Sequence, residues 1–131
     1  GELGPVTNVD YAVDALLAEK LLDARPDYGW LSEETPDELA RREHASRVFV
    51  IDPIDGTAAM IGKVPQWTIS VGIVADGRAW AGAVYNPMTD EFFLGAVGEG
   101  ATLNRRPMRA SLREKLEGAR MIGQRNRFAD S

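Results

Sequence analysis

The sequence predicts an α+β domain in which a largely antiparallel sheet packs with one long and one short helix. Apolar residues recur with helical spacing over residues 8–24, near the start of the chain. Short β-branched and aromatic runs then follow one another, separated by turn signals such as Asp76-Gly77 and Asn86-Pro87. Because strands joined by short turns pair with their neighbours, these runs predict a β-meander.

Composition and charge restrict the possible functions. The 131 residues are 44% hydrophobic and 27% charged, and the absence of cysteine excludes disulfides and thiolate metal sites or nucleophiles. With no apolar run long enough for a bilayer and no signal-peptide pattern, we expect a cytoplasmic protein without a membrane partner. Residues 1–57 hold 13 acidic and 5 basic residues, which suits cation binding. The arginines in residues 58–131 are scattered and do not indicate a nucleic-acid surface.

The first predicted element is a helix that begins near Thr7 and ends at about Ala24. Thr7 and Asp10 have the spacing of a capping box, and Arg25-Pro26 ends the helix. From the residues alone, Asp10 is a first-turn carboxylate favoured by the helix dipole. The apolar residues of the expected buried face are Val9, Ala12, Val13, Leu16, Leu17 and Leu21.

A short strand is expected over residues 28–31, and it leads directly into the adjacent carboxylates Glu33 and Glu34. Residues 36–46 then form a polar excursion with a helical turn and a loop. His44, the only histidine, lies among charged residues there, so we expect it to be solvated rather than catalytic. A Ser-His-Asp triad has no candidate.

The central stretch runs from Arg47 to Thr57. Residues 48–51 are a continuous, mostly β-branched run, which predicts a buried strand. Since Pro53 cannot donate to a neighbouring strand, we expect the strand to stop near Asp52.

Two carboxylates follow this strand, Asp52 and Asp55. Gly56 permits a tight turn after them, and residues 57–61 predict a short helix. Carboxylates are preferred ligands of Mg²⁺, and free amides at a helix start can bind phosphate. This arrangement predicts metal-assisted phosphate chemistry.

Asp52 and Asp55 also allow other interpretations. An Asp-x-x-Asp-Gly run also occurs in ordinary turns, because Asp and Gly both favour them. A calcium-binding loop is excluded by the missing alternating acidic positions and closing glutamate. A covalent aspartyl-phosphate site of the haloacid-dehalogenase kind has its aspartates two residues apart, whereas here they are three apart.

The rest of the chain predicts hairpin partners and a short closing segment. The expected elements are strands over residues 68–74, 80–85, 91–97 and 101–103, a polar turn from Asn104, a short helix from Ser111 to Glu117, and the start of a strand over 119–122.

Three motifs resemble the inositol monophosphatase superfamily, whose members are Mg²⁺-dependent, lithium-sensitive phosphate monoesterases. These motifs are Val6-Thr7-Asn8-Val9-Asp10, Ser32-Glu33-Glu34 and Asp52-Pro53-Ile54-Asp55-Gly56-Thr57. The resemblance covers nearly the whole chain and about half of a family member. It implies that residues 1–118 form the sheet-and-helix half of a layered αβαβα sandwich, and that residues 119–131 begin the second half. The sequence departs from the family at Ala59 and Met60, where a polar residue and an aromatic are usual.

The same resemblance implies a role for each matching position. Two or more Mg²⁺ ions would be held by Glu33, Asp52, Asp55 and the carbonyl of Ile54. The substrate phosphate would be bound by Asp55, Gly56 and Thr57. The attacking water would be oriented by Glu33, Thr57 and Asp10. No covalent intermediate is implied, and Glu34 would support the site from behind.

The expected substrate is a small phosphorylated metabolite. Residues 30–35 and 66–68 resemble the bacterial 3′(2′),5′-bisphosphate nucleotidases, which favours 3′-phosphoadenosine 5′-phosphate, with an inositol monophosphate as the alternative. The alternative of another class is a non-catalytic metal- and phosphate-binding domain. The complete enzyme is expected to be a homodimer. Residues 1–131 alone are expected to be inactive, because the family's Trp-Asp motif, which supplies a further metal carboxylate, does not occur in them.

Overall fold

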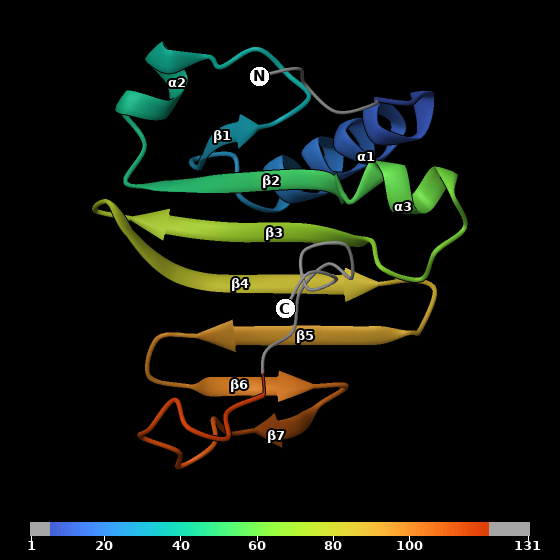
Figure 1. Cartoon of the computed structure of the whole chain (residues 1–131). Helices are drawn as coiled ribbons and strands as arrows, with labels where there is room; N and C mark the ends of the chain where they lie inside the picture. Colours follow the sequence, from blue (N-terminus) through green and yellow to red (C-terminus); the bar gives the residue numbers. More distant parts are fainter. Residues whose placement is uncertain (1–5, 121–131) are drawn as a thin grey trace.

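The computed structural model describes residues 6–120, and it confirms the α+β class (Figure 1). Seven strands form one sheet in chain order; β1 and β2 are parallel, and every other neighbouring pair is antiparallel. The helices are α1 (Asn8–Ala24), α2 (Leu39–Glu43) and α3 (Thr57–Ile61). The strands are β1 (Gly29–Ser32), β2 (Arg47–Asp55), β3 (Thr68–Ala75), β4 (Arg78–Asn86), β5 (Glu91–Ala96), β6 (Gly100–Leu103) and β7 (Arg106–Met108). Within residues 6–120, no helix has both the length and the apolar composition that crossing a membrane requires.

Helix α1 begins and ends where the sequence predicts. The Val9 amide donates to Thr7 Oγ1 at 3.1 Å, and the Thr7 amide donates to Asp10 Oδ2 at 2.9 Å, which confirms the capping box. At the other end, the Arg25 amide donates to the Leu21 carbonyl at 2.9 Å. Local capping signals therefore determine both helix boundaries.

The buried face of α1 differs from the predicted one. Val9 and Leu16 are 48% and 55% exposed, whereas Asp10 and Asp14 are 0% and 2% exposed. Asp10 accepts a hydrogen bond from the Thr57 hydroxyl at the start of α3, and Asp14 accepts one from the Ser32 hydroxyl at the end of β1, which makes their burial tolerable. The apolar residues of α1 that reach the core are Leu17, Leu21 and Leu22. These tertiary hydrogen bonds, rather than the apolar spacing alone, orient the helix.

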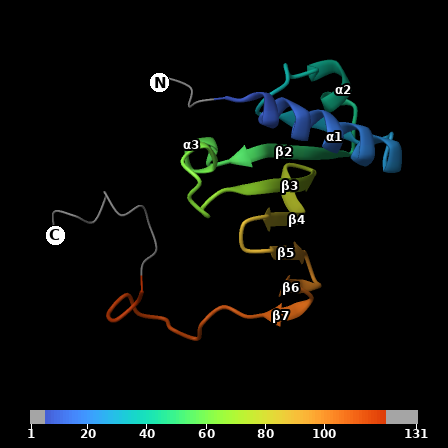
Figure 2. The same cartoon turned by 90° about the vertical axis from the view of Figure 1, so that its right-hand side faces the viewer.

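The core lies between α1 and strands β1 to β3, on one side of the sheet (Figure 2). Tyr28, Phe49 and Ile51 are its buried members. The Tyr28 and Phe49 rings are tilted, with centroids 5.0 Å apart. Val71 and Ile73 of β3 pack against this cluster from the neighbouring strand. This packing fixes the strands whose ends carry the carboxylate clusters.

Strand β2 alternates in burial, whereas the sequence predicted a run buried throughout. Phe49 and Ile51 are 4% and 3% exposed, but Val50 between them is 36% exposed. Successive strand residues point to opposite faces, and α1 covers only one face of β2. Within the described residues, the opposite face is therefore open.

Strand β2 also continues past Asp52, where the sequence predicted its end. Its pairing with β3 shifts register between Asp52 and Asp55. Pro53, which lies in this irregular stretch, needs no strand partner for its missing N–H. A β-bulge thus accommodates the proline without ending the strand.

Strand β7 was not predicted; only a polar turn was expected from Asn104. The two-residue connection has positive φ at both positions, 47° for Asn104 and 67° for Arg105, as in a type I′ hairpin turn. Leu103 pairs with Arg106 directly across this turn. Arg105 stands where glycine is usual in such turns, so the hairpin signal was weak.

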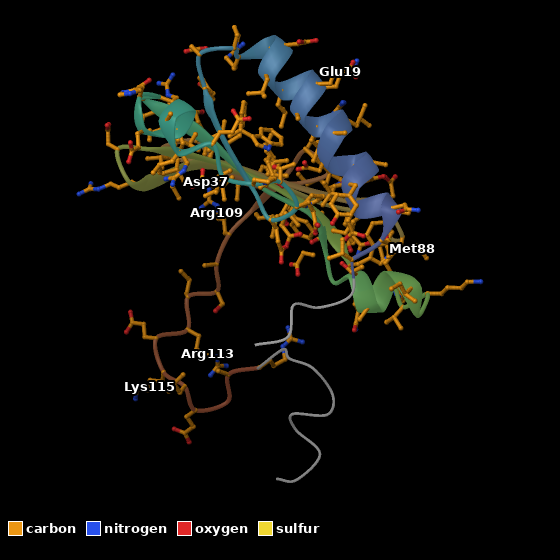
Figure 3. All side chains as sticks on the ribbon, turned by 90° about the horizontal axis from the view of Figure 1, so that it is seen from above. Glu19, Asp37, Met88, Arg109, Arg113 and Lys115 are labelled. Carbon is orange, nitrogen blue, oxygen red and sulfur yellow. The ribbon has the colours of Figure 1, made fainter. Side chains whose placement is uncertain are left out.

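The predicted helix from Ser111 to Glu117 is wrong, because the segment forms no regular element. Leu112 and Leu116 are 99% and 92% exposed, and such a short helix is unstable without packing. The segment leaves the sheet on the side opposite α1, as the positions of Glu19, Arg113 and Lys115 show (Figure 3). The predicted strand 119–122 has no regular structure in its first two residues and then passes outside the described residues. The domain boundary after residue 118 remains a prediction.

Candidate metal and phosphate site

The two carboxylate clusters meet at one edge of the sheet. Because β1 and β2 are parallel, their carboxyl ends lie at the same edge, so Glu33 comes beside Asp52 and Asp55. A pocket of ≈ 440 Å³ opens there. Its lining includes six positions singled out from the sequence: Glu33, Asp52, Ile54, Asp55, Gly56 and Thr57. The structure therefore brings these residues together, with Glu34 beside them.

The bulge in β2 places both aspartates on one face. Asp52 is paired with Ser70, and Asp55 is paired with Thr68. Ser70 and Thr68 are two residues apart in a regular strand, so their side chains share a face. The aspartates opposite them share that face as well, although a spacing of three would normally separate them.

The pocket carries negative charge, and no salt bridge among the described residues offsets it. Burial, together with the charges of Glu33 and Asp55, raises the pKa of Asp52 to about 6. The salt bridges among residues 6–120 join Lys20 to Glu19 and Arg42 to Asp37, away from the pocket. A bound cation would relieve this repulsion.

Glu34, on the β1 side of the pocket, also lies among negative charges. Burial raises its pKa, and the charges of Asp10, Glu33 and Asp14 raise it further. The carboxylates of helix α1 thus contribute to the raised pKa of Glu34, after burial.

Asp10 lies behind the pocket and is fully buried. It accepts a hydrogen bond from Thr57 Oγ1 at 2.9 Å on one carboxylate oxygen and bonds from Thr7 on the other. Burial alone would raise the pKa of Asp10, but the hydrogen bonds from Thr7 and Thr57 outweigh burial and lower it. Asp10 is therefore a stable carboxylate that connects α1 to the start of α3.

Gly56 permits the sharp turn between β2 and α3. Its φ of 97° is strained for any residue with a side chain, and a Cβ would lie 2.9 Å from the Gln66 carbonyl oxygen. Helix α3 then begins at Thr57, whose hydroxyl also lies 3.1 Å from the Ile54 carbonyl oxygen. The first amides of a helix have no acceptor within it, so they can serve an anion.

The chemistry of these groups fits a hard divalent cation. Carboxylate and carbonyl oxygens are the ligands that Mg²⁺ prefers. The pKa of Asp52 is raised first by burial and then by the charges of Glu33 and Asp55, which a bound cation would offset. As placed among residues 6–120, no three Asp, Glu, His or Cys groups already converge on a single ion position. Modest side-chain rearrangement would be needed to close a coordination sphere around an ion.

The roles of two residues beside the site were not predicted from the sequence. Asp14 and Ser32 are both buried and hydrogen-bonded to each other, immediately behind the Glu33–Glu34 turn. The available signal was a second aspartate four residues after Asp10, which places both carboxylates on one face of a helix. The apolar pattern was given more weight and concealed this signal.

The sequence and the fold were compared with known proteins. The pattern of the inositol monophosphatase family matches residues 1–127. Inositol-1-monophosphatase of Rhizobium meliloti (strain 1021) is 36% identical over 114 residues, which are 87% of this chain and 42% of that protein. Nus factor SuhB of Escherichia coli (strain K12) is 34% identical over 113 residues, 86% of this chain and 42% of that protein.

A solved structure has the same fold. Staphylococcal inositol monophosphatase-1, in an inhibitory complex soaked with LiCl, superposes with a TM-score of 0.77 at 27% identity. The match covers 86% of this chain and 42% of that chain. The present chain thus spans less than half the length of the relatives it matches. With the sequence match, the shared fold and the assembled carboxylate pocket in agreement, the chain belongs to the inositol monophosphatase family.

Proposed function

We propose that the protein containing this chain is a Mg²⁺-dependent phosphate monoester hydrolase. Its family is one of phosphatases. One observation carries the proposal: a single pocket joins Glu33 with Asp52 and Asp55 beside the start of a helix. Hard oxygen ligands and free amides in one pocket suit a metal ion and a phosphate group together.

Glu33, Asp52, Asp55 and the Ile54 carbonyl would hold the metal. When bound, two or more Mg²⁺ ions would neutralise charge on the phosphate oxygens and acidify a water molecule. The three carboxylates would supply oxygen ligands at fixed positions in the pocket.

Thr57 and Glu33 would orient the attacking water. Thr57 donates its hydroxyl hydrogen to Asp10, so its oxygen lone pairs are available to accept a hydrogen bond from the attacking water. Glu33 would take one proton from that water, and the amides of Gly56 and Thr57 would hold the phosphate in line. The water oxygen would bond to phosphorus as the ester P–O bond breaks. The leaving alkoxide would take up a proton from solvent while Glu33 returns its proton to solvent, so no covalent enzyme intermediate would form.

Activity measurements test the proposal directly. The protein should release phosphate from a small monoester with Mg²⁺, lose activity with EDTA and regain it when Mg²⁺ is restored. Glu33→Gln should lower kcat by about 10²-fold or more, because a charge near the reacting atoms is lost. Glu19→Gln, on the outer side of α1, is the matched control. Equal activity with and without Mg²⁺ would refute the proposal.

Two substrates are candidates. The motifs at residues 30–35 and 66–68 favour 3′-phosphoadenosine 5′-phosphate. The 36% identical relative named inositol-1-monophosphatase favours an inositol ester instead. Measuring kcat/KM for both substrates at equal Mg²⁺ decides between them, since the two candidates predict opposite ratios.

We further propose that residues 1–131 alone turn over phosphate esters poorly. The proposed ligands among the described residues all lie between Glu33 and Asp55, and the family resemblance implies a further carboxylate from elsewhere. Misplacement of reacting groups by about 1 Å can cost about 10²-fold in rate. Expressing residues 1–131 and comparing their rate with that of the complete protein tests this; full activity would contradict it.

A further inference from the structure

Asp14 is a buried carboxylate that the proposed chemistry does not use. It lies in α1, is 2% exposed and is four residues after Asp10. A buried charge requires a strong partner. Its partner is Ser32, whose Oγ donates a buried hydrogen bond to Asp14 Oδ1 at 2.5 Å. Eighteen residues separate the two, so the bond ties α1 to the end of β1.

The Ser32 hydroxyl also contacts the turn that carries Glu33 and Glu34. The Glu34 amide donates to Ser32 Oγ at 3.3 Å. A hydroxyl has one proton, so donating it to Asp14 leaves the oxygen lone pairs for the Glu34 amide. Asp14 thereby fixes the direction of the hydroxyl. Between these residues, the Glu33 amide donates to the Ile51 carbonyl of β2 at 3.2 Å, so the backbone of the turn is held from both sides.

Helix α1 reaches the opposite wall of the pocket in the same way. Asp10, one turn earlier, accepts the Thr57 hydroxyl at 2.9 Å. One rigid helix therefore offers two carboxylates, four residues apart, to hydroxyl groups on the two walls. The two bonds thus connect α1 both to the end of β1 and to the start of α3.

We propose that Asp14 is a positioning residue, which holds Glu33 and Glu34 at the pocket through the Ser32 hydroxyl. The inference rests on the proposed metal-binding function. Supporting residues behind a metal ligand typically alter metal affinity by about 10–100-fold when they are lost. We expect a loss of that size from Asp14→Ala, although Asp14 itself does not line the metal pocket.

The test uses the complete protein, with Mn²⁺ as the probe ion, and measures Mn²⁺ affinity by titration. Asp14→Ala and Ser32→Ala should each weaken affinity by about 10-fold or more, and the double variant should be no weaker than either single one. Asp14→Asn retains an oxygen acceptor, so it should stay within about 2-fold of wild type. Asp23→Ala, an exposed aspartate near the end of α1, is the matched control.

A second measurement does not depend on the metal. Amide hydrogen exchange at Glu34, measured by NMR on metal-free protein, should accelerate in Asp14→Ala and Ser32→Ala but not in Asp14→Asn. A purely structural role would lower the melting temperature without this local change. If Asp14→Ala does not fold, Ser32→Ala and Asp14→Asn carry the test.

Each outcome is decisive. Wild-type affinity and Glu34 protection in a folded Ser32→Ala protein would overturn the relay while leaving the proposed function intact. An equal loss in Asp14→Asn and Asp14→Ala would also overturn it, because charge rather than the hydrogen bond would then be responsible. Failure of the wild-type protein to bind Mn²⁺ would overturn both the inference and the function beneath it.

Discussion

The two halves of the sheet are built differently. All the buried hydrophobic side chains of the described chain lie between residues 28 and 54, under α1 or at the end of β2. In strands β4 to β7, Asn86 is the only buried residue, and Phe92 and Leu94 are 41% and 50% exposed. An open apolar groove of ≈ 360 Å³ lies between Leu17 of α1 and Phe92 of β5.

This difference shows that forming strands and fixing the side chains of a functional site have different structural requirements. Tight turns and neighbouring pairings are enough to order the later strands as a meander. A metal and phosphate site also needs side chains with fixed positions, which require packing on more than one side. The carboxylates stand at the ends of β1 and β2, where α1 supplies that packing. The predictions below test this distinction.

The largest expected effect on stability comes from a cavity-forming substitution in the core under α1. Phe49→Ala should lower the free energy of unfolding by about 3–5 kcal/mol, because Phe49 is 4% exposed and leaves a cavity. Phe92→Ala removes the same atoms from an exposed position, so it should cost less than about 1 kcal/mol. Urea unfolding of both variants measures the difference. Similar losses would show that the two halves are equally packed.

The next effect separates activity from stability. Asp52→Asn should lower kcat/KM for a phosphate monoester by about 10²–10³-fold, because a proposed metal ligand loses its charge. Its melting temperature should stay the same or rise, because repulsion with Glu33 and Asp55 is relieved. Phosphate release and thermal unfolding of one preparation give both values. Near-normal turnover would remove Asp52 from the metal site.

A smaller effect appears in the pH dependence of stability without metal. The pKa of Asp52 is raised from 3.8 to about 6 in the folded state, so the folded state binds the proton more tightly. The stability of the wild-type protein should therefore fall as pH rises from about 4 to 6, by about 1–2 kcal/mol after allowance for partial exposure. Asp52→Asn should lack this fall. Unfolding of both proteins in EDTA across this pH range measures the effect. If their curves of stability against pH are parallel, the assignment to Asp52 is contradicted.

The smallest effect lies where α1 begins. Thr7→Ala removes a helix cap and one hydrogen bond to Asp10, and should cost about 1 kcal/mol. The Thr57 bond to Asp10 remains, so kcat should change little compared with the Asp52 variant. Thermal unfolding and kinetics measure the two effects. A loss of kcat as large as that of Asp52→Asn would show that Thr7 belongs to the reacting machinery.

The sequence predicted most of the fold because its signals are local. The Thr7 and Asp10 pair located helix α1, and Gly56 located the turn before α3. Information that depends on distant neighbours was not predictable: the burial of Asp14 depends on Ser32, eighteen residues away. The failed helix over 111–117 had the right local pattern but lacks packing partners among the described residues. The same limit applies to the site, because the family resemblance of three motifs implied its members, whereas the fold shows that Glu33, Asp52 and Asp55 share one pocket.

The bulge in β2 changes how residue spacing should be counted. Alternation along a strand is a matter of parity: an even spacing keeps two side chains on one face, and an odd spacing separates them. By inserting one surplus residue, the bulge makes the odd spacing of Asp52 and Asp55 equivalent to an even one. Ile54 lies between them and has no paired residue in β3. Its carbonyl oxygen lies 3.1 Å from the Thr57 hydroxyl oxygen. Deleting Pro53 would therefore restore an even spacing and leave both carboxylates on one face of a regular strand.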